Sequence, residues 1–196
     1  MPFSSLKSKE FILATVGIIM MPIGASIVYN YQPLFLQVVN HIYTYKLSLF
    51  LFIYGLCSIF GTWLGGKLIA KRDKATLIIF QLVCGGVFVL LYLFSNYLIP
   101  VIVLILIFGV LDGMGYNLIQ YIEASVVPDS PELANGLFLS ILNGGIALGI
   151  AIGGFLVDGF GIMSIFIFGA LFLLLALIMM VYVIKIMKIP LKYSRQ

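Results

Sequence analysis

Long runs of uncharged, apolar residues separate the few charged positions of this chain. Charged residues make up 9% of the 196 residues, whereas a soluble domain carries about 25%. They gather in short clusters, and the runs between the clusters match or exceed the ~20 apolar residues that cross a bilayer core. Backbone polar groups at that depth must bond within the chain, which favours helices. The sequence therefore predicts an all-α protein that crosses a membrane several times.

Six of these runs are expected to form membrane-crossing helices. They cover residues 11–37, 47–70, 75–94, 98–122, 131–157 and 162–184. A polar lead of residues 1–10 precedes them, and a basic tail of residues 185–196 follows. Lys71 to Lys74 are expected to form a very tight turn, and residues 123–130 a loop.

An even number of crossings returns the chain to the side on which it began. Basic residues gather on that side: Lys7 and Lys9, the group from Lys67 to Lys74, and the tail. The opposite side carries only Lys46. Because basic residues mark the cytoplasmic ends of spans, we expect both termini in the cytoplasm and the chain in the inner membrane of the cell.

Glycines recur at four-residue spacing in two of the predicted helices. Gly61 and Gly65 match Gly149 and Gly153, each pair 88 positions apart, and Gly145 extends the second set. This spacing puts glycines on one helix face, where a second helix can approach closely. Three spans lie within the interval, so the two copies cross the membrane in opposite senses. The pattern predicts an inverted repeat of three plus three helices, which is a transporter feature. The two repeats cover residues 11–95 and 98–184.

Asp112 is the only acidic residue well inside a predicted helix. It lies midway along residues 98–122, near the bilayer centre, where an ionisable side chain is expensive and usually functional. The carboxyl group there could couple protons or bind a substrate, or it could be a structural group bonded to another helix; both interpretations stay open. Tyr116, Gln120 and Glu123 follow at helical spacing and extend a polar stripe toward the cytoplasm.

A second polar cluster interrupts the first predicted helix. Tyr29, Asn30 and Gln32 could hydrogen-bond a substrate or bond another helix, and Tyr29-Asn30 recurs as Tyr116-Asn117, 87 positions later. Because polar groups avoid lipid, the helices over residues 11–37 and 98–122 are expected to line a cavity. The almost wholly apolar helices over residues 75–94 and 162–184 are expected to face lipid.

The remaining charged residues and cysteines indicate no catalytic chemistry. Lys71, Arg72 and Glu123 lie near the cytoplasmic face, where gating or surface ion pairs are expected. Cys57 and Cys84 lie in apolar runs and are expected to be small buried side chains. Motifs for phosphate, zinc or serine-hydrolase chemistry are lacking from the sequence. We therefore expect no enzyme, no catalytic residue, no cofactor, no metal and no nucleic-acid partner.

Several short motifs of the chain resemble motifs of transporters of the major facilitator superfamily. Residues 127–161 are similar to the loop after its tenth helix and to its eleventh helix, through Val127-Pro128, Pro131-Glu132-Leu133-Ala134, Asn143-Gly144, Leu148-Gly149 and Gly153-Gly154. Gly65-Gly66-Lys67-Leu68, followed by Lys71-Arg72, resembles the loop after helix 8, although Ala70 stands where that motif has an acid. The nearest likeness is to proton-coupled drug and sugar efflux permeases of the arabinose-efflux type.

The resemblance covers nearly the whole chain, as the C-terminal half of such a transporter. It implies half of a major facilitator fold and proton-coupled efflux of a small organic solute, drug or sugar. The implied partners are that solute, the proton, the lipid bilayer, and either a second six-helix half or a second copy of the chain. The alternative is a non-transporting accessory or truncated membrane subunit that requires an N-terminal half.

Overall fold

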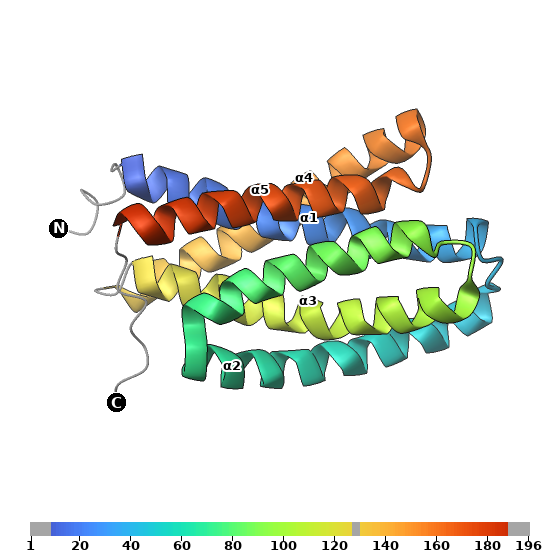
Figure 1. The fold of residues 1–196 in the computed structure, drawn as a ribbon, viewed down its shortest axis with the longest axis horizontal. Coiled ribbons are helices and arrows are strands. Elements are labelled where there is room, and N and C mark those ends of the chain that lie inside the picture. Colours follow the sequence, from blue (N-terminus) through green and yellow to red (C-terminus); the bar gives the residue numbers. More distant parts are fainter. Residues whose placement is uncertain (1–8, 127–129, 188–196) are drawn as a thin grey trace.

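The computed structural model describes residues 9–126 and 130–187, and nearly all of them are helical (Figure 1). The five helices are α1 (Lys9–Val38), α2 (Thr44–Leu93), α3 (Leu98–Val126), α4 (Pro131–Phe160) and α5 (Ser164–Met187). The described residues contain no strand. The prediction of an all-α chain is therefore confirmed.

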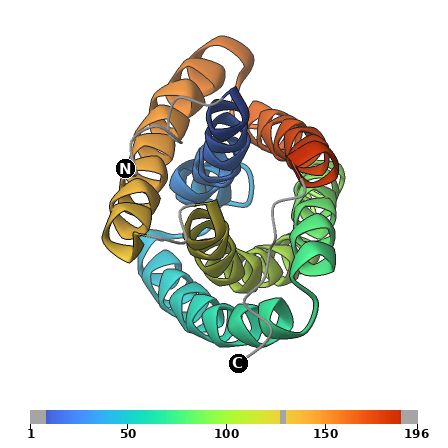
Figure 2. The ribbon, with the colours of Figure 1, turned by 90° about the vertical axis from the view of Figure 1, so that its left-hand side faces the viewer.

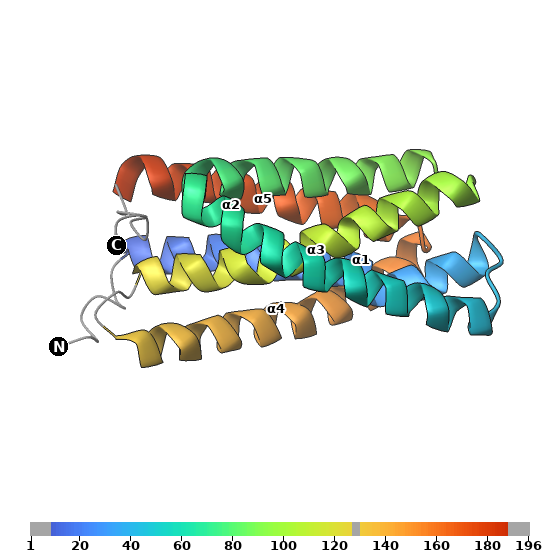
Figure 3. The same ribbon diagram turned by 90° about the horizontal axis from the view of Figure 1, so that it is seen from below.

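The longest helix, α2, breaks at Arg72. The backbone of Arg72 leaves the helical region, with φ −150° and ψ 70°, and Figures 1 and 3 show the chain reversing its direction there. α2 therefore comprises two helical segments, residues 44–71 and 73–93, which we call its first and second segments. The tight turn predicted from Lys71 to Lys74 reduces to this one non-helical residue, and the structure has five helices where six were predicted.

Side chains next to Arg72 explain why the break is so short. The Thr76 hydroxyl donates to the carbonyl oxygens of Arg72 and Leu68, at 2.7 and 3.1 Å. The Lys74 N–H donates to the Asp73 carboxylate, at 2.6 Å. Thr76 thus satisfies carbonyl oxygens at the break, and Asp73 satisfies one of the N–H groups that the start of a helix leaves without a partner.

Four helices are long and apolar enough to cross a membrane. The qualifying stretches are Tyr45–Leu93, Leu98–Ser125, Pro131–Phe160 and Ser164–Tyr182. The described part of α1 is not among them; it contains Pro22, Pro33 and the polar cluster around Asn30. The prediction of a multi-pass membrane protein is supported, whereas the predicted six spans are not reached by this count.

Viewed end-on, α1 and α3 lie toward the middle of the bundle, with α4, α5 and the two segments of α2 around them (Figure 2). Aromatic side chains fill much of the interior. Phe35 meets Phe166 edge to face at 4.8 Å between ring centres, and Phe88 meets Phe108 at 4.9 Å. The start of α1, the Arg72 break, the end of α3 and the end of α5 lie at the same end of the bundle (Figure 1).

Glycines of α4 bring that helix against α1. An added Cβ at Gly149 would lie 2.7 Å from the Ser26 Cβ. An added Cβ at Gly153 would lie 2.5 Å from the Tyr31 ring, and at Gly145 the same distance from Pro22. Only glycine permits this approach, because no real side chain tolerates such contacts.

The first segment of α2 contacts α3 in the same way. An added Cβ at Gly61 would collide with the carbonyl oxygen of Val110, and one at Gly65 would lie 3.1 Å from the Met114 Cα. In return, an added Cβ at Gly113 of α3 would collide with the Ser58 carbonyl oxygen. Glycines on both helices therefore allow backbone-to-backbone contact here.

Two predicted helix ends are wrong. Residues 123–130 were expected to form a loop, but α3 continues to Val126, so Glu123 is helical. Likewise, α4 runs to Phe160, whereas the helix predicted from residue 131 was expected to end at residue 157. Near the end of α3, the Ser125 hydroxyl donates to the Tyr121 carbonyl oxygen of the preceding turn, at 2.8 Å.

Candidate functional site

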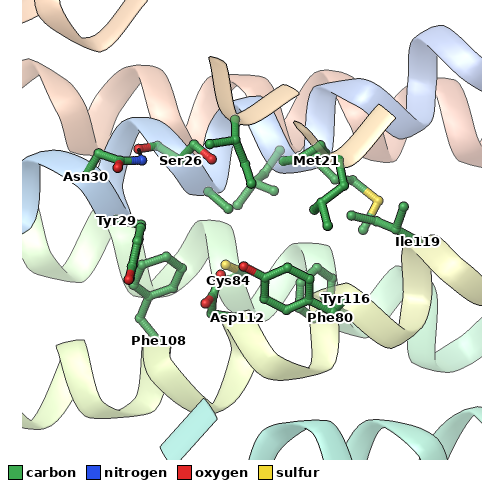
Figure 4. Close-up of a pocket in the computed structure, with 16 residues that line it drawn as sticks. Met21, Ser26, Tyr29, Asn30, Phe80, Cys84, Phe108, Asp112, Tyr116 and Ile119 are labelled. Atoms are coloured by element: carbon green, nitrogen blue, oxygen red, sulfur yellow. Dashed lines mark hydrogen bonds between the residues drawn. The ribbon is translucent and has the colours of Figure 1, made fainter. Parts of the chain in front are cut away.

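A cavity of about 80 Å³ lies between α1 and α3. Its walls are mostly apolar and aromatic, with a few polar groups from α1 and α3 (Figure 4). The lining residues are Met21, Pro22, Ala25, Ser26, Tyr29 and Asn30 of α1; Phe108, Asp112, Gly115, Tyr116 and Ile119 of α3; and Phe80, Cys84, Leu142, Ile146 and Leu173 from the other helices. Such a volume is well below the ~300 Å³ or more of a pocket for a drug-sized molecule.

Asp112 is the only acidic residue that lines this cavity. The phenol of Tyr54, the thiol of Cys84 and the phenol of Tyr116 are close enough to interact with its carboxyl group. The Tyr54 hydroxyl approaches Asp112, but it makes no hydrogen bond of regular geometry within the described residues. Asp112 therefore faces a cavity with hydroxyl and thiol neighbours, rather than lipid.

The cavity lining contains no lysine, arginine or histidine. Two of the described cations lie over aromatic rings elsewhere: the Lys67 ammonium is 3.7 Å from the centre of the Trp63 ring, and the Lys46 ammonium is 5.8 Å from that of Tyr45. A carboxylate at low dielectric is expensive unless a proton or a counter-ion neutralises it. Because the lining supplies no counter-ion, the Asp112 carboxyl group is available to a proton or to a cationic ligand.

α1 contributes the polar side of the cavity opposite Asp112. The Asn30 amide donates to the Ser26 carbonyl oxygen at 3.0 Å, which orients the side chain and leaves its own oxygen as an acceptor. The Tyr29 ring packs against Tyr54 at 5.6 Å between centres. Both of the tyrosine rings that line the cavity are partly exposed, Tyr29 by 44% and Tyr116 by 39%.

Three predicted site residues lie outside this lining. Gln32 is fully buried, and neither polar atom of its amide has a hydrogen-bond partner among the described residues. The Asn117 amide donates to the Thr62 carbonyl oxygen, on the first segment of α2. Gln120 is exposed. The structure thus brings Asp112, Tyr29, Asn30 and Tyr116 together, but not these three.

The predicted gate residues do not form ion pairs with one another in the described part of the chain. Lys71 and Arg72 are exposed. Glu123 is 1% exposed, and neither carboxyl oxygen has a hydrogen-bond partner among the described residues. The contact that does join the Arg72 break to α3 runs from the Tyr121 hydroxyl to the Asp73 carboxylate, at 2.8 Å.

The sequence did not indicate that the second segment of α2 contributes to the cavity. Phe80 and Cys84 line it, although this segment was expected to face lipid. Cys84 was expected to be buried, and it is 1% exposed. The available signal was the spacing of Phe80 and Cys84, which puts an aromatic ring and a thiol one turn apart on one helix face.

Comparison with known proteins gives three distant relatives and no matching family model. The chain is 27% identical to the transcription regulatory protein OpdE of Pseudomonas aeruginosa over 89% of its length. It is also 27% identical, over 80% of its length, to the uncharacterized MFS-type transporter YtbD of Bacillus subtilis and to a protein of Helicobacter pylori named as a probable sugar efflux transporter. The chain spans 40–43% of the length of these relatives.

Two of the three relatives are named as transporters. Transporters are not enzymes, so these names agree with the expectation that this chain is not an enzyme. Together with the apolar helices, they support a multi-pass membrane protein. The name of the third relative, a regulatory protein, refers to that protein alone.

Proposed function

We propose that this chain is the C-terminal half of a major-facilitator-type secondary transporter that exports a small organic solute in exchange for protons. The observation that carries the proposal is the cavity inside an apolar helix bundle where Asp112 and four polar side chains of α1 and α3 converge. An ionisable group at membrane depth that faces a cavity marks a substrate or proton pathway. The named relatives support the same class.

We count six crossings in this proposal, because the Arg72 break divides α2 into two antiparallel segments. α1 and both segments of α2 form the first repeat, and α3, α4 and α5 form the second. The glycine contacts support this inverted repeat. Gly61 of α2 contacts Val110 of α3, and Gly149 of α4 contacts Ile23 of α1. The two glycines are 88 positions apart and their two partners are 87 positions apart, so the contacts occupy equivalent places in the two repeats. The second helix of each repeat thus packs on the first helix of the other, as a two-fold axis in the membrane requires.

Charge supports the orientation of both termini toward the cytoplasm of a cell with an inner membrane. Lys67, Lys71, Arg72 and Lys74 lie around the break, at the end of the bundle where α1 begins and α5 ends (Figure 1). Basic residues are enriched on the cytoplasmic side of membrane proteins. Lys71 and Arg72 are then available for gating contacts with the partner half.

The mechanism uses one carboxyl group for two ligands in turn. With the cavity open to the outside, Asp112 takes up a proton. With the cavity open to the cytoplasm, it releases the proton and binds the solute with Tyr29, Asn30 and Tyr116. Glu123 lies 11 residues beyond Asp112 on one side of α3, about 16 Å along the helix axis. Gln120 lies between them and extends the path to the cytoplasmic end.

The second half of the cavity must come from another set of helices. Its volume of about 80 Å³ is too small to enclose a drug-sized solute, and the relatives are more than twice as long as this chain. A separate N-terminal half or a second copy of this chain supplies the missing wall in the proposal. In the alternative, the chain is an accessory or truncated subunit, and its assembled form transports neither solute nor protons.

The test is proton movement in proteoliposomes. The assembled form of the chain is reconstituted into liposomes that enclose a pH-sensitive dye. Ethidium or arabinose is then added as the transported probe. We expect probe-dependent proton flux that Asp112→Asn abolishes. Asp158→Asn is the matched control, because Asp158 is exposed near the C-terminal end of α4 and does not line the cavity. Equal flux in wild type and Asp112→Asn would refute the role of Asp112, and no flux with either probe would favour the accessory subunit.

A further inference from the structure

We infer that a groove between the second segment of α2 and α5 binds a neutral lipid that carries one free hydroxyl group. The hydroxyl group hydrogen-bonds the Gln81 side chain, and the hydrocarbon chain lies against Gly85 and Gly86. This inference goes beyond the proposed function, because the groove shares no lining residue with the Asp112 cavity and its occupant is bound from the bilayer rather than transported.

The groove has a volume of about 280 Å³ and nine lining residues. It runs along the second segment of α2 from Gln81 to Val89, and α5 supplies the other wall, which includes Leu171 and Leu174. Both helices belong to stretches that are apolar enough to cross a membrane, and Figures 2 and 3 show them side by side. Val89 and Leu174 are each 50% exposed. In a bilayer, hydrocarbon chains rather than water therefore meet the groove.

Gln81 is the only polar residue of this lining, and its amide oxygen is an unused acceptor. The residue is 2% exposed. Its amide nitrogen donates to the Met21 sulfur at 3.7 Å, whereas its amide oxygen has no hydrogen-bond partner within the described residues. A buried acceptor without a donor is costly. Because the groove opens to hydrocarbon, we look for the donor in a molecule that is dissolved in the bilayer.

An uncharged hydroxyl group is the donor that suits this place. A buried water needs about two to four polar partners, whereas the lining offers one polar side chain. A hydroxyl group on a hydrocarbon is held in addition by apolar contacts. No charged residue lines the groove, and Lys74 lies about 10 Å from Gln81 along the helix axis. A phosphate head group at Gln81 would therefore lack a counter-ion, which favours a neutral lipid.

Two glycines leave room in the groove that no described part of the chain fills. At Gly61, Gly113 and Gly149 an added Cβ would collide with a neighbouring helix, so packing explains those glycines. At Gly85 and Gly86 an added Cβ would meet no heavy atom of the described residues within 4 Å. Glycine also weakens a helix relative to alanine. The open space beside Gly85 and Gly86 therefore fits a hydrocarbon chain from outside the protein.

The positions of these residues give the bound lipid a direction. Gln81 lies nearer than Val89 to the Arg72 break and to the basic residues around it. The hydroxyl group is therefore oriented toward the basic end of the bundle. The hydrocarbon chain extends away from that end, past Gly85 and Gly86, for about 12 Å.

The test is photo-crosslinking with hexadecan-1-ol that carries a diazirine group in its chain. The purified full chain is reconstituted in phosphatidylcholine nanodiscs at one chain per disc and irradiated, and the adducts are located by mass spectrometry. We expect saturable labelling that concentrates in residues 82–89 and 170–177. Unlabelled hexadecan-1-ol should compete about threefold to tenfold better than hexadecyl methyl ether, because the ether cannot donate a hydrogen bond.

Two variants separate the hydrogen bond from the shape of the groove. Gln81→Leu removes the acceptor, so the alcohol and the ether should compete equally. Gly86→Leu fills the groove and should abolish saturable labelling. Gly66→Leu is the matched control, because an added Cβ at Gly66 also meets no described atom within 4 Å, yet Gly66 lies on the first segment of α2, outside the groove. It should be labelled like the wild type.

Equal competition by the alcohol and the ether on the wild-type chain would overturn the inference, even if Gln81→Leu did not fold. Labelling spread evenly over all the lipid-exposed helices, or unchanged in a folded Gly86→Leu chain, would do the same. A second copy of the chain is the rival occupant. If discs with two chains lose the labelling, and unlabelled alcohol does not compete in discs with one chain, the groove belongs to the second copy. The assay measures no transport, so its outcome is independent of the proteoliposome test.

Discussion

Two carboxyl groups on one side of α3 lie in contrasting surroundings. Asp112 opens into the cavity and has Tyr54, Tyr116 and Cys84 near it. Glu123 is almost wholly buried, and neither oxygen has a hydrogen-bond partner in the part of the chain that the structure describes. A buried polar group without a partner destabilises the folded state. The Glu123 carboxyl group therefore makes no stabilising hydrogen bond within the described residues.

Replacing Glu123 by leucine is expected to stabilise the chain while impairing transport. Removing an unsatisfied buried group recovers about 1–3 kcal/mol, so the unfolding temperature should rise. Unfolding can be followed with a thiol-reactive dye in a Cys57→Ser background, because Cys84 is 1% exposed in the folded chain whereas Cys57 is only partly buried. Glu132→Leu, at an exposed position in the first turn of α4, should leave transport unchanged and should not raise the unfolding temperature, because an acid there favours the helix dipole. A lower unfolding temperature for Glu123→Leu would contradict the prediction.

At the residue scale, the sequence singled out Asp112, which lines the cavity, but it did not predict the contacts of the amide side chains. Asp112 was identifiable because a single acid in a long apolar run costs free energy in the membrane unless it faces other helices or a cavity. Asn117 was expected in the cavity, yet its amide bonds the Thr62 carbonyl oxygen. Which acceptor an amide reaches depends on helix rotation, and helical spacing does not specify that rotation.

Among the helices, α2 is the one whose geometry depends on a few polar contacts. Its two segments reverse direction at Arg72 with no loop between them. Thr76 and Asp73 bond the backbone on either side, and Tyr121 of α3 donates to the Asp73 carboxylate. The sequence predicted a turn at this position from four consecutive charged residues. It did not predict the link to α3, because a tyrosine 48 positions away carries no local signal.

Tyr121→Phe is expected to loosen the Arg72 break without unfolding the bundle. The variant loses the hydroxyl that bonds Asp73 but keeps the ring. Because Lys71, Arg72 and Lys74 are exposed, limited digestion with trypsin should cut there several-fold faster than in the wild type. Tyr92→Phe, which alters an exposed tyrosine elsewhere on α2, is the control. Equal cleavage rates in all three proteins would show that the Tyr121 contact does not restrain the break.

The packing of α4 on α1 gives a second prediction for an element. An added Cβ at Gly149 would lie 2.7 Å from Ser26 Cβ and 2.8 Å from the Ile23 carbonyl oxygen, whereas one at Gly144 would meet only Ile19, at 4.0 Å. Gly149→Ala should therefore destabilise the chain by about 1–3 kcal/mol through overpacking. Gly144→Ala should be neutral or slightly stabilising, because alanine favours helix. Equal unfolding temperatures for the two variants would contradict this packing.

For the whole molecule, run length and composition were enough to predict an all-α membrane chain. They were not enough to predict where the helices meet, because apolar faces in lipid carry no preference for one neighbour over another. The glycines partly remedied this, since they indicated which helices approach closely. The contribution of Phe80 and Cys84 to the cavity depended on the rotation of the second α2 segment, which its nearly uniform apolar sequence does not reveal.

The size of the assembled particle tests whether this chain acts alone. The proposed cavity needs a second wall, so we expect a protein mass of at least twice 21.6 kDa in a mild detergent. Light scattering combined with refractive index separates the protein mass from that of the detergent. A stable monomer that still drives probe-dependent proton flux would refute the need for a second half or copy.

The chain has one tryptophan, Trp63, which lies 55% exposed on the first segment of α2 beneath the Lys67 ammonium. Its indole is therefore the dominant intrinsic fluorophore of the molecule. Trp63 lies two positions along the chain from Gly61 and from Gly65, the glycines that face α3. Any companion protein that covers this stretch would displace the ammonium or exclude solvent, and the emission spectrum would shift. The molecule thus carries its own optical probe, so assembly can be timed without attaching a dye.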